Sequence, residues 1–144
     1  MSLNWSTKCS LSFLHRSCCC LITSAVSPEF VWIQSLRQWI TQIIPEGEFF
    51  DYAAKYQGAS QEITPARINE DIYTQVQNTT AKIYEKLNLR GVIRVDFMLV
   101  EDTAFVIELN TVPGMSKGSL VPQQVAAAKL NLTDFLNDII DSTF

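Results

Sequence analysis

The sequence predicts an α+β fold in which an antiparallel hairpin packs with helices, and three observations support this class. Apolar residues recur every four or seven positions across residues 65–88, which is the period of one buried helix face. Residues 92–100 and 104–110 are rich in β-branched and aromatic residues, and three polar residues separate them. Two later segments each begin at a Ser or Thr that can cap a helix. The predicted order is therefore loop, helix, hairpin, loop, helix, helix.

Length and charge restrict the classes of partner. With 144 residues, of which 47% are apolar, the chain can bury the core of one domain or of part of a larger one. A net charge of -4 leaves no basic face to replace the counterions of nucleic acid. No apolar run approaches the roughly 20 residues of a membrane-spanning helix. We therefore expect neither nucleic acid nor a membrane as a partner.

Composition changes near residue 40. Residues 1–40 form an atypical segment in which no element is predicted, and residues 41–144 form the folded region. All four cysteines lie within the first 20 residues, so they cannot cross-link the rest of the chain. His15 lies among them, but three contiguous cysteines lack the spacing of a zinc site.

The first elements of the folded region are a short strand and a long helix. Residues 41–44 favour a strand, and a connection punctuated by Pro45, Gly47 and Gly58 follows it. A connection of this length is often functional. A helix is predicted from about Pro65, with one apolar stripe formed by Ile68, Ile72, Val76, Ile83 and Leu87.

The hairpin and two helices complete the prediction. Residues 101–103 are the expected turn between the two strands, and residues 110–118 form a glycine-containing loop. Ser119 is expected to cap a helix to about Lys129, with Pro122 in its first turn. Thr133 is expected to cap the last helix, whose inward residues would be Phe135, Leu136, Ile139 and Ile140.

The hairpin carries polar residues among side chains that otherwise suit a core. Arg94 and Asp96 share one face of the first strand, and Glu108 and Asn110 share one face of the second. A three-residue turn would place Asp96 opposite Glu108 and Arg94 opposite Asn110. Two carboxylates about 5 Å apart repel each other unless a cation lies between them. Asp96, Glu108 and Asn110 are oxygen donors of the kind that Mg²⁺ prefers. The alternative is a solvated sheet face on which Arg94 offsets the acidic charge.

The loop after the hairpin favours an anion-binding site. Its glycines allow backbone N–H groups to approach a ligand, and it leads into the start of a helix. A helix N-terminus can hold a carboxylate through free N–H groups and the helix dipole. An ordinary capped turn is the alternative.

Three stretches resemble a known family. The residues RVDFML, IELNTVPGMSKGSLVP and EFFDYAAKYQG followed by EITPA are similar to the C-terminal lobe of D-alanine–D-alanine ligases, which are ATP-grasp enzymes. The resemblance covers about residues 41–141 in the family's order. It implies the C-terminal lobe of an ATP-grasp domain, an antiparallel sheet packed with helices. It also implies ATP-dependent formation of D-alanyl-D-alanine, through an acyl phosphate, for peptidoglycan synthesis.

The resemblance also implies roles for individual residues. Asp96, Glu108 and Asn110 match the ligands of Mg²⁺ or Mn²⁺, and Arg94 and the N–H of Gly114 match the groups that stabilise the intermediates. The remaining matches are Ser119 and Leu120 for the second D-alanine, Lys55 for the nucleotide, Tyr56 for the closing catalytic loop, and Glu29, in SPEF, for the ribose of ATP.

Other expectations concern the whole enzyme. The resemblance implies a cytoplasmic enzyme, a homodimeric parent, and ATP and D-alanine as partners. The family's domains for the first D-alanine and for adenine have no counterpart in this sequence, so the fragment is expected to be nearly inactive. Two alternatives remain: another ATP-grasp carboxylate–amine ligase, and a non-catalytic binding or assembly module.

Overall fold

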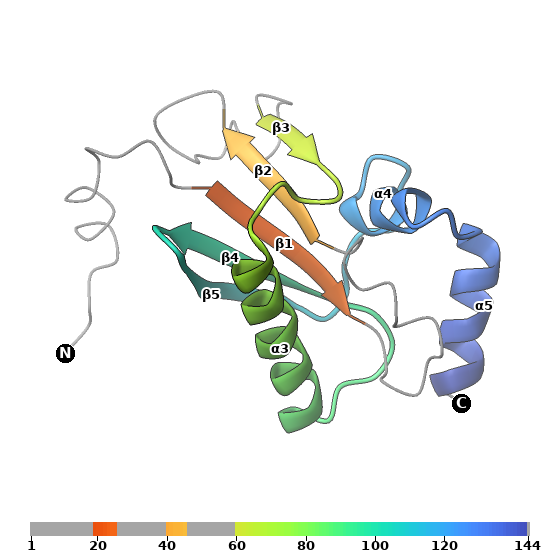
Figure 1. Cartoon of the computed structure of the whole chain (residues 1–144). Helices are drawn as coiled ribbons and strands as arrows, with labels where there is room; N and C mark the ends of the chain where they lie inside the picture. Colours follow the sequence, from red (N-terminus) through yellow and green to blue (C-terminus); the bar gives the residue numbers. More distant parts are fainter. Residues whose placement is uncertain (1–18, 26–39, 46–59, 144) are drawn as a thin grey trace.

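An antiparallel sheet of five strands forms the centre of the structure, in the order β3-β2-β1-β4-β5 (Figure 1). The structure is a computed structural model that describes residues 19–25, 40–45 and 60–143. Neighbouring strands are antiparallel throughout. The elements are β1 (Cys19–Ala25), β2 (Ile40–Pro45), β3 (Ser60–Ile63), α3 (Glu70–Lys86), β4 (Ile93–Val100), β5 (Thr103–Asn110), α4 (Leu120–Ala127) and α5 (Leu132–Thr143). The sheet and its helices are the α+β architecture that the sequence predicts.

Strand β1 is an element that the sequence analysis did not predict. It lies inside residues 1–40 and is the central strand, pairing with β2 on one side and β4 on the other. Leu21, Ile22 and Thr23 have β propensity, but their run is too short to show a period. Strand β3 likewise lies within the predicted connection, whereas β2 confirms the strand expected at residues 41–44.

Helix α3 covers one face of the sheet. It begins later than predicted, at Glu70 rather than near Pro65, because the side chain of Asn69 caps it by accepting a hydrogen bond from the N–H of Ile72 at 2.8 Å. Its apolar side packs on the inward residues of β4. The shared core comprises Ile40, Ala66, Ile72, Tyr73, Val76, Tyr84, Ile93, Val95, Phe97 and Leu99. Leu87 was predicted to belong to this stripe but forms the helix C-cap and is 58% exposed.

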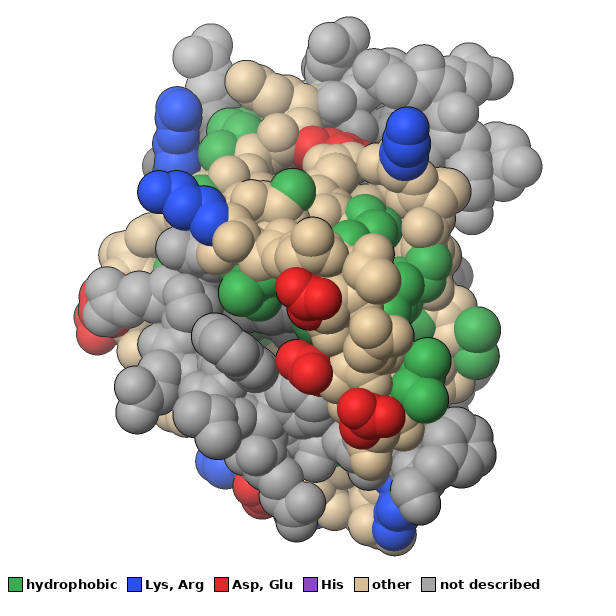
Figure 2. All heavy atoms as spheres, turned by 90° about the vertical axis from the view of Figure 1, so that its right-hand side faces the viewer, with side chains coloured by type: hydrophobic (Ala, Val, Ile, Leu, Met, Phe, Trp, Pro, Cys, Tyr) green, Lys and Arg blue, Asp and Glu red, His purple; other side chains and the backbone are tan. Residues whose placement is uncertain are grey.

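Helices α4 and α5 bury a second, smaller cluster. Val121, Val125 and Phe135 form its centre, with Leu136 and Ile139 packed against it. Pro122 lies in the first turn of α4, as predicted. Ile140 was expected to face inward, but it is 55% exposed. Acidic side chains lie beside exposed hydrophobic ones on this side of the molecule (Figure 2).

The caps of these two helices differ from the prediction. Asn131, not Thr133, caps α5, because its Oδ1 accepts hydrogen bonds from the N–H groups of Thr133 and Asp134. Ser119 is the N-cap residue of α4 by position, but its side chain makes no capping hydrogen bond. In the described part of the chain, no helix has the length and apolar character required to cross a bilayer.

Candidate functional site

The two hairpin acids lie opposite each other on the face of the sheet that α3 does not cover. Asp96 of β4 is the Cα partner of Glu108 of β5, and Arg94 is the partner of Asn110. Directly paired residues project to the same face, so the predicted pairing of the acids is confirmed. Asp96 is buried at 3% exposure, whereas Glu108 remains exposed.

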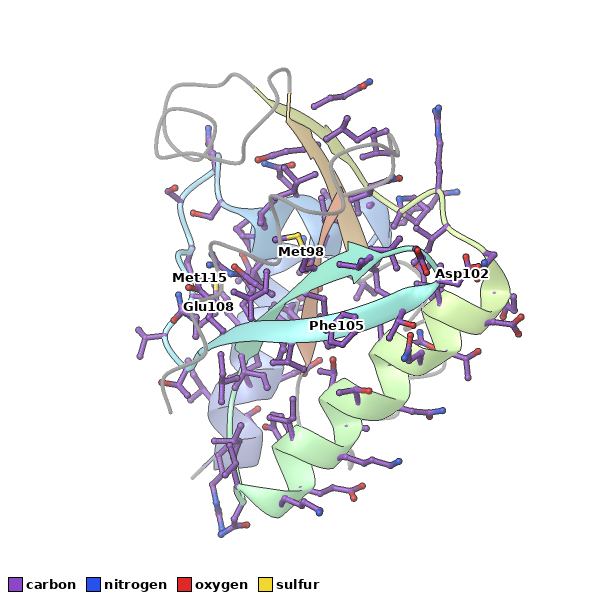
Figure 3. The ribbon with its side chains drawn as sticks, turned by 90° about the vertical axis from the view of Figure 1, so that its left-hand side faces the viewer. Met98, Asp102, Phe105, Glu108 and Met115 are labelled. Carbon is purple, nitrogen blue, oxygen red and sulfur yellow. The ribbon has the colours of Figure 1, made fainter. Side chains whose placement is uncertain are left out.

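This pairing arises from two features that the sequence analysis did not predict. Thr103 pairs with Val100, so the turn contains two residues, Glu101 and Asp102, rather than three. The register then shifts between Phe97 and Asp96, where β5 contains one extra residue in a β-bulge. The two differences cancel, and Glu108 still reaches Asp96. In Figure 3, Asp102 marks the turn and Glu108 lies toward the other end of β5.

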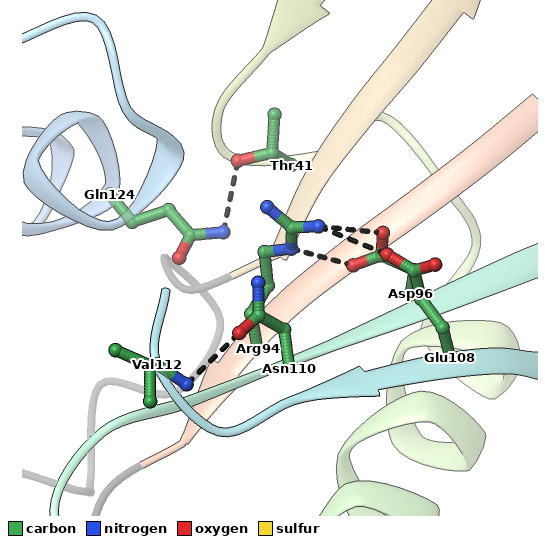
Figure 4. Close-up of polar contacts among 7 residues, drawn as sticks. All are labelled: Thr41, Arg94, Asp96, Glu108, Asn110, Val112 and Gln124. Atoms are coloured by element: carbon green, nitrogen blue, oxygen red, sulfur yellow. Dashed lines mark hydrogen bonds and ion pairs between the residues drawn. The ribbon is translucent and has the colours of Figure 1, made fainter. Parts of the chain in front are cut away.

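Arg94 contacts both acids (Figure 4). Its Nε lies 2.8 Å from Oδ1 of Asp96, and its Nη2 lies 3.1 Å from Oδ2. The same Nη2 lies 3.3 Å from Oε1 of Glu108. The arginine therefore supplies the positive charge that this carboxylate pair needs, which is the role that the alternative interpretation gave to Arg94. The solvated face assumed by that interpretation is wrong for Asp96, because Asp96 is buried.

Burial dominates the electrostatics of Asp96. Removal from water raises the pKa of Asp96 above its ordinary value, and the nearby carboxylate of Glu108 raises it further. The hydrogen bonds and the charge of Arg94 act in the opposite direction and only partly offset the rise. Arg94 thus limits the rise in the pKa of Asp96 but does not cancel it.

The donor atoms of this face fit a hard cation. The part of the chain that the structure describes holds no group of three or more His, Cys, Asp or Glu side chains suited to a metal. Asp96, Glu108 and the Asn110 amide instead form a set of two carboxylates and one carbonyl, which suits Mg²⁺ when substrate oxygens or water complete the shell. Asn110 Oδ1 already accepts a hydrogen bond from the N–H of Val112 at 2.9 Å, and a carbonyl oxygen has a second lone pair.

The loop after β5 brings two predicted site residues together. A Cβ placed on Gly114 would lie 2.8 Å from the Oγ of Ser119, so only glycine fits there without a shift. Ser119 Oγ also lies 2.8 Å from Ser116 Oγ. Leu120 follows as the first residue of α4. The backbone of Gly114 therefore lies close to the start of α4.

Three predicted site residues cannot be placed. Glu29, Lys55 and Tyr56 lie outside the described residues. Their assigned roles remain predictions.

The sequence analysis missed one polar network, which joins α4 to β2. Gln124 of α4 is fully buried, and its Nε2 donates a hydrogen bond to Thr41 Oγ1 at 3.0 Å. Thr41 Oγ1 in turn lies 2.6 Å from Thr64 Oγ1. A glutamine within the mostly apolar segment LVPQQVAA was the available signal, but its partner lies 83 positions away in sequence.

Comparison with known proteins identifies the family. The family model described as D-ala D-ala ligase C-terminus matches residues 34–141. The chain belongs to this family. The resemblance found in the sequence is therefore confirmed, and the matched region contains every candidate site residue except Glu29.

Relatives of this ligase family share the sequence closely but are much longer. The chain is 47% identical over 106 residues to a D-alanine--D-alanine ligase of Phocaeicola vulgatus, which covers 73% of this chain and 33% of that protein. It is 46% identical to a D-alanine--D-alanine ligase of Bacteroides fragilis over the same share of each chain. The chain thus spans about a third of the length of these curated relatives.

Solved structures of D-alanine--D-alanine ligases share the fold. The ligase from Bacillus anthracis superposes with a TM-score of 0.66 at 27% identity, covering 88% of this chain and 40% of that one. A structure of the same ligase complexed with ATP gives a TM-score of 0.66 at 26% identity. The antiparallel sheet with its helices is therefore the C-terminal ATP-grasp lobe of such a ligase.

Proposed function

We propose that this chain is the C-terminal catalytic portion of a D-alanine–D-alanine ligase, which forms D-alanyl-D-alanine for peptidoglycan synthesis at the expense of ATP. The observation that carries the proposal is the cross-strand pair of Asp96 and Glu108, with Arg94 between them, in a chain that belongs to this ligase family. A use of ATP and D-alanine also implies a cytoplasmic location.

The proposed reaction has two steps. The carboxylate of one D-alanine attacks the γ-phosphorus of ATP, and ADP leaves as an acyl phosphate forms. The amine of the second D-alanine then attacks the acyl carbon, and phosphate leaves with the electron pair of the broken C–O bond. Negative charge develops at both steps, so catalysis requires positioned donors rather than a covalent nucleophile.

Residues of this chain provide such donors. Arg94 is the cation of the site, and we propose that it stabilises the acyl phosphate and the tetrahedral intermediate. The N–H of Gly114 would donate to the developing oxyanion. The start of α4 would hold the carboxylate of the second D-alanine through the free N–H groups of its first turn, beginning at Leu120, and through Ser119 Oγ. The N–H of Ser119 itself already donates to the carbonyl of Ser116 at 2.8 Å.

Asp96, Glu108 and Asn110 would hold Mg²⁺. The ion, when bound, neutralises charge on the phosphates of ATP. Glu108 is the more available of the two acids, because its contact with Arg94 is the longest of the three and its side chain is 46% exposed. Asp96 would remain the fixed, buried ligand.

We further propose that the 144 residues alone turn over slowly or not at all. The match corresponds to only about a third of the relatives' length. The described residues suggest a site for the metal, for the phosphates that the metal binds and for the second substrate, but not for adenine or the first D-alanine. A phosphate-release assay coupled to D-alanine addition measures this directly. Robust D-alanine-dependent turnover would contradict it.

Calorimetry tests the core of the proposal. Titration of the chain with Mg²⁺ and a non-hydrolysable ATP analogue should give binding that requires the metal, and Asp96→Asn should weaken it at least tenfold because a carboxylate ligand is lost. Asp102→Asn is the matched control, since Asp102 lies in the exposed turn. Equal binding by the wild type and Asp96→Asn would refute the assignment of Asp96.

A substrate panel on a full-length ligase that contains this segment separates the remaining functions. Preference for D-alanine as both acid and amine supports the proposal, whereas preference for another pair identifies a different ATP-grasp ligase. Absence of turnover by that full-length protein would favour a non-catalytic module.

A further inference from the structure

Helix α4 belongs to a different apolar cluster from the sheet that carries the acids. Val121 and Val125 pack with Phe135 of α5, whereas the inward residues of β4 pack with α3. Apolar packing between helices is non-directional and tolerates small shifts. A directional contact between α4 and the sheet would fix the start of the helix relative to the acid pair.

The network of Gln124, Thr41 and Thr64, of which Gln124 and Thr41 are buried, is such a contact. Gln124 and Thr41 are both 0% exposed, and their hydrogen bond of 3.0 Å joins α4 to β2. Thr64, just after β3, lies 2.6 Å from the same hydroxyl. A buried amide that loses its partner meets no water in exchange, so this contact has a strict geometry.

Thr41 lies in the same cross-strand row as the acids. Its Cα partner is Ile22 of β1, the partner of Ile22 on the other side is Asp96, and the partner of Asp96 is Glu108. With strands spaced about 4.8 Å apart, Thr41 and Asp96 are separated by roughly 10 Å through a rigid ladder. The anchor of α4 is thus fixed within the sheet relative to the acids.

Gln124 also lies on the same face of α4 as Leu120, the first residue of the helix. It follows Leu120 by four residues, which places the two on one face of α4, one turn apart. A shift at Gln124 therefore moves the first turn of the helix with it.

We infer that Gln124 is a positioning residue, which holds the N-terminus of α4 at a fixed place relative to Asp96 and Glu108 through Thr41. The inference rests on the proposed function in one respect: the first turn of α4 is taken to bind the carboxylate of an amino-acid substrate. The effect of the hydrogen bond between Gln124 and Thr41 on the position of α4 does not depend on that assignment.

The test uses the ¹⁵N-labelled 144-residue chain and the variants Thr41→Val, Gln124→Leu and the double variant. Thr41→Val keeps the shape of the side chain but removes the hydroxyl that accepts the 3.0 Å hydrogen bond from Gln124 Nε2. The double variant removes both polar groups, which typically restores much of the stability. It therefore separates a loss of positioning from a general loss of folding.

The rate of amide hydrogen exchange at Gln123 reports how firmly the first turn of α4 is held. The N–H of Gln123 bonds the carbonyl of Ser119 at 3.3 Å and closes the first turn of α4. We expect exchange at Gln123 to rise about tenfold in Thr41→Val relative to the amides of α3, and to stay raised in the double variant although its thermal midpoint recovers. If both the exchange rate at Gln123 and the thermal midpoint return to wild-type values in the double variant, Thr41 and Gln124 only fill space, and the inference is overturned.

The response to D-alanine reports the functional consequence. In the wild type, D-alanine should shift the amide resonances of Ser119 and Leu120, and in the double variant the concentration needed should rise at least fivefold. An unchanged D-alanine response in the double variant would overturn the positioning role. A wild type without any response would overturn the proposed substrate site, while the exchange data would still decide whether the hydrogen bond between Gln124 and Thr41 positions α4.

Glu62→Ala is the matched control. Glu62 of β3 also contacts α4, accepting a hydrogen bond from Gln123 Nε2 at 2.9 Å, but this contact is exposed. Water can replace it, so we expect less than a twofold change in exchange at Gln123. A change as large as that of Thr41→Val would show that any contact between the sheet and α4 has the same effect, and would also overturn the inference.

Discussion

Replacing Arg94 with methionine leaves the carboxylate of Asp96 buried without the guanidinium that contacts both of its oxygens. In the wild type these contacts measure 2.8 Å and 3.1 Å. Methionine retains part of the aliphatic length of arginine but provides neither its charge nor its N–H donors. The substitution therefore isolates the contribution of the cation to folding, independently of any ligand.

The structure sets the size of the expected effect. Removing one partner of a buried ion pair costs about 3–5 kcal/mol, because the other charge stays buried. The side chain of Asp96 is only 5% exposed, but that of Arg94 is 22% exposed and is partly screened by water. The contact with Glu108 adds little, since that side chain is 46% exposed. We expect Arg94→Met to lower the free energy of unfolding by about 2–3 kcal/mol near neutral pH.

The loss of unfolding free energy caused by Arg94→Met should depend on pH. Burial already raises the pKa of Asp96 above 3.8, and removing Arg94 takes away the contacts that oppose this rise. A group with a raised pKa in the folded state binds more protons when folded, so stability falls as pH rises from the unfolded pKa through the folded pKa. The cost of the substitution should therefore be fully present only above the folded pKa that Asp96 has in the variant, which is the higher of the two folded values. It should shrink to about 1 kcal/mol, the value of lost hydrogen bonds, as pH falls toward the unfolded pKa.

Urea unfolding followed by circular dichroism at neutral and acidic pH measures both quantities. Arg67→Met is the matched control, because Arg67 is exposed and its hydrogen bond to Gln42 uses the backbone N–H. It should change stability by no more than about 0.5 kcal/mol. A loss for Arg94→Met as small as that of the control, or a loss that does not diminish on acidification, would refute this account of Asp96.

Three further predictions concern the packing, the bulge and a cap. Val76→Ala, at a fully buried position of α3, should lower the free energy of unfolding by about 2 kcal/mol, measured by urea titration. Deletion of Ile107, the extra residue of the bulge, should leave Asp96 opposite Glu108, and cross-strand nuclear Overhauser effects between β4 and β5 should persist; their disappearance would show that the bulge is required for the register. Asn131→Ala removes the cap of α5 and should cost about 1 kcal/mol, whereas an unchanged thermal midpoint would show that the cap contributes nothing.

The face of the candidate site was predictable because alternation along a strand is a local property. Arg94 and Asp96 must share a face of β4 whatever the rest of the chain does. Their pairing across the hairpin was also predicted, but from a three-residue turn, whereas the structure reaches the same pairs with a shorter turn and a bulge. Local pattern cannot distinguish these two solutions, because both place the same side chains on the same face.

Helix boundaries, in contrast, could not be predicted from the local sequence. Asn69 and Asn131 cap α3 and α5 at positions that the sequence analysis did not select, because several polar residues near each helix start are possible caps. Ile140 and Leu87 fit an apolar period but lie exposed. Whether a residue at the edge of an apolar stripe is covered depends on which element packs there.

The sequence by itself determined the family, the acidic hairpin and the side chains that share its face, because each of these depends on residues that are close together along the chain. Only the tertiary structure decided that β1 lies between β2 and β4, that Arg94 bridges the two acids, and that Gln124 contacts Thr41. The physical reason is that hydrogen bonds and ion pairs between distant segments form only when those segments are brought together. The choice of partners then follows from burial, which makes an unpaired polar group too costly to leave.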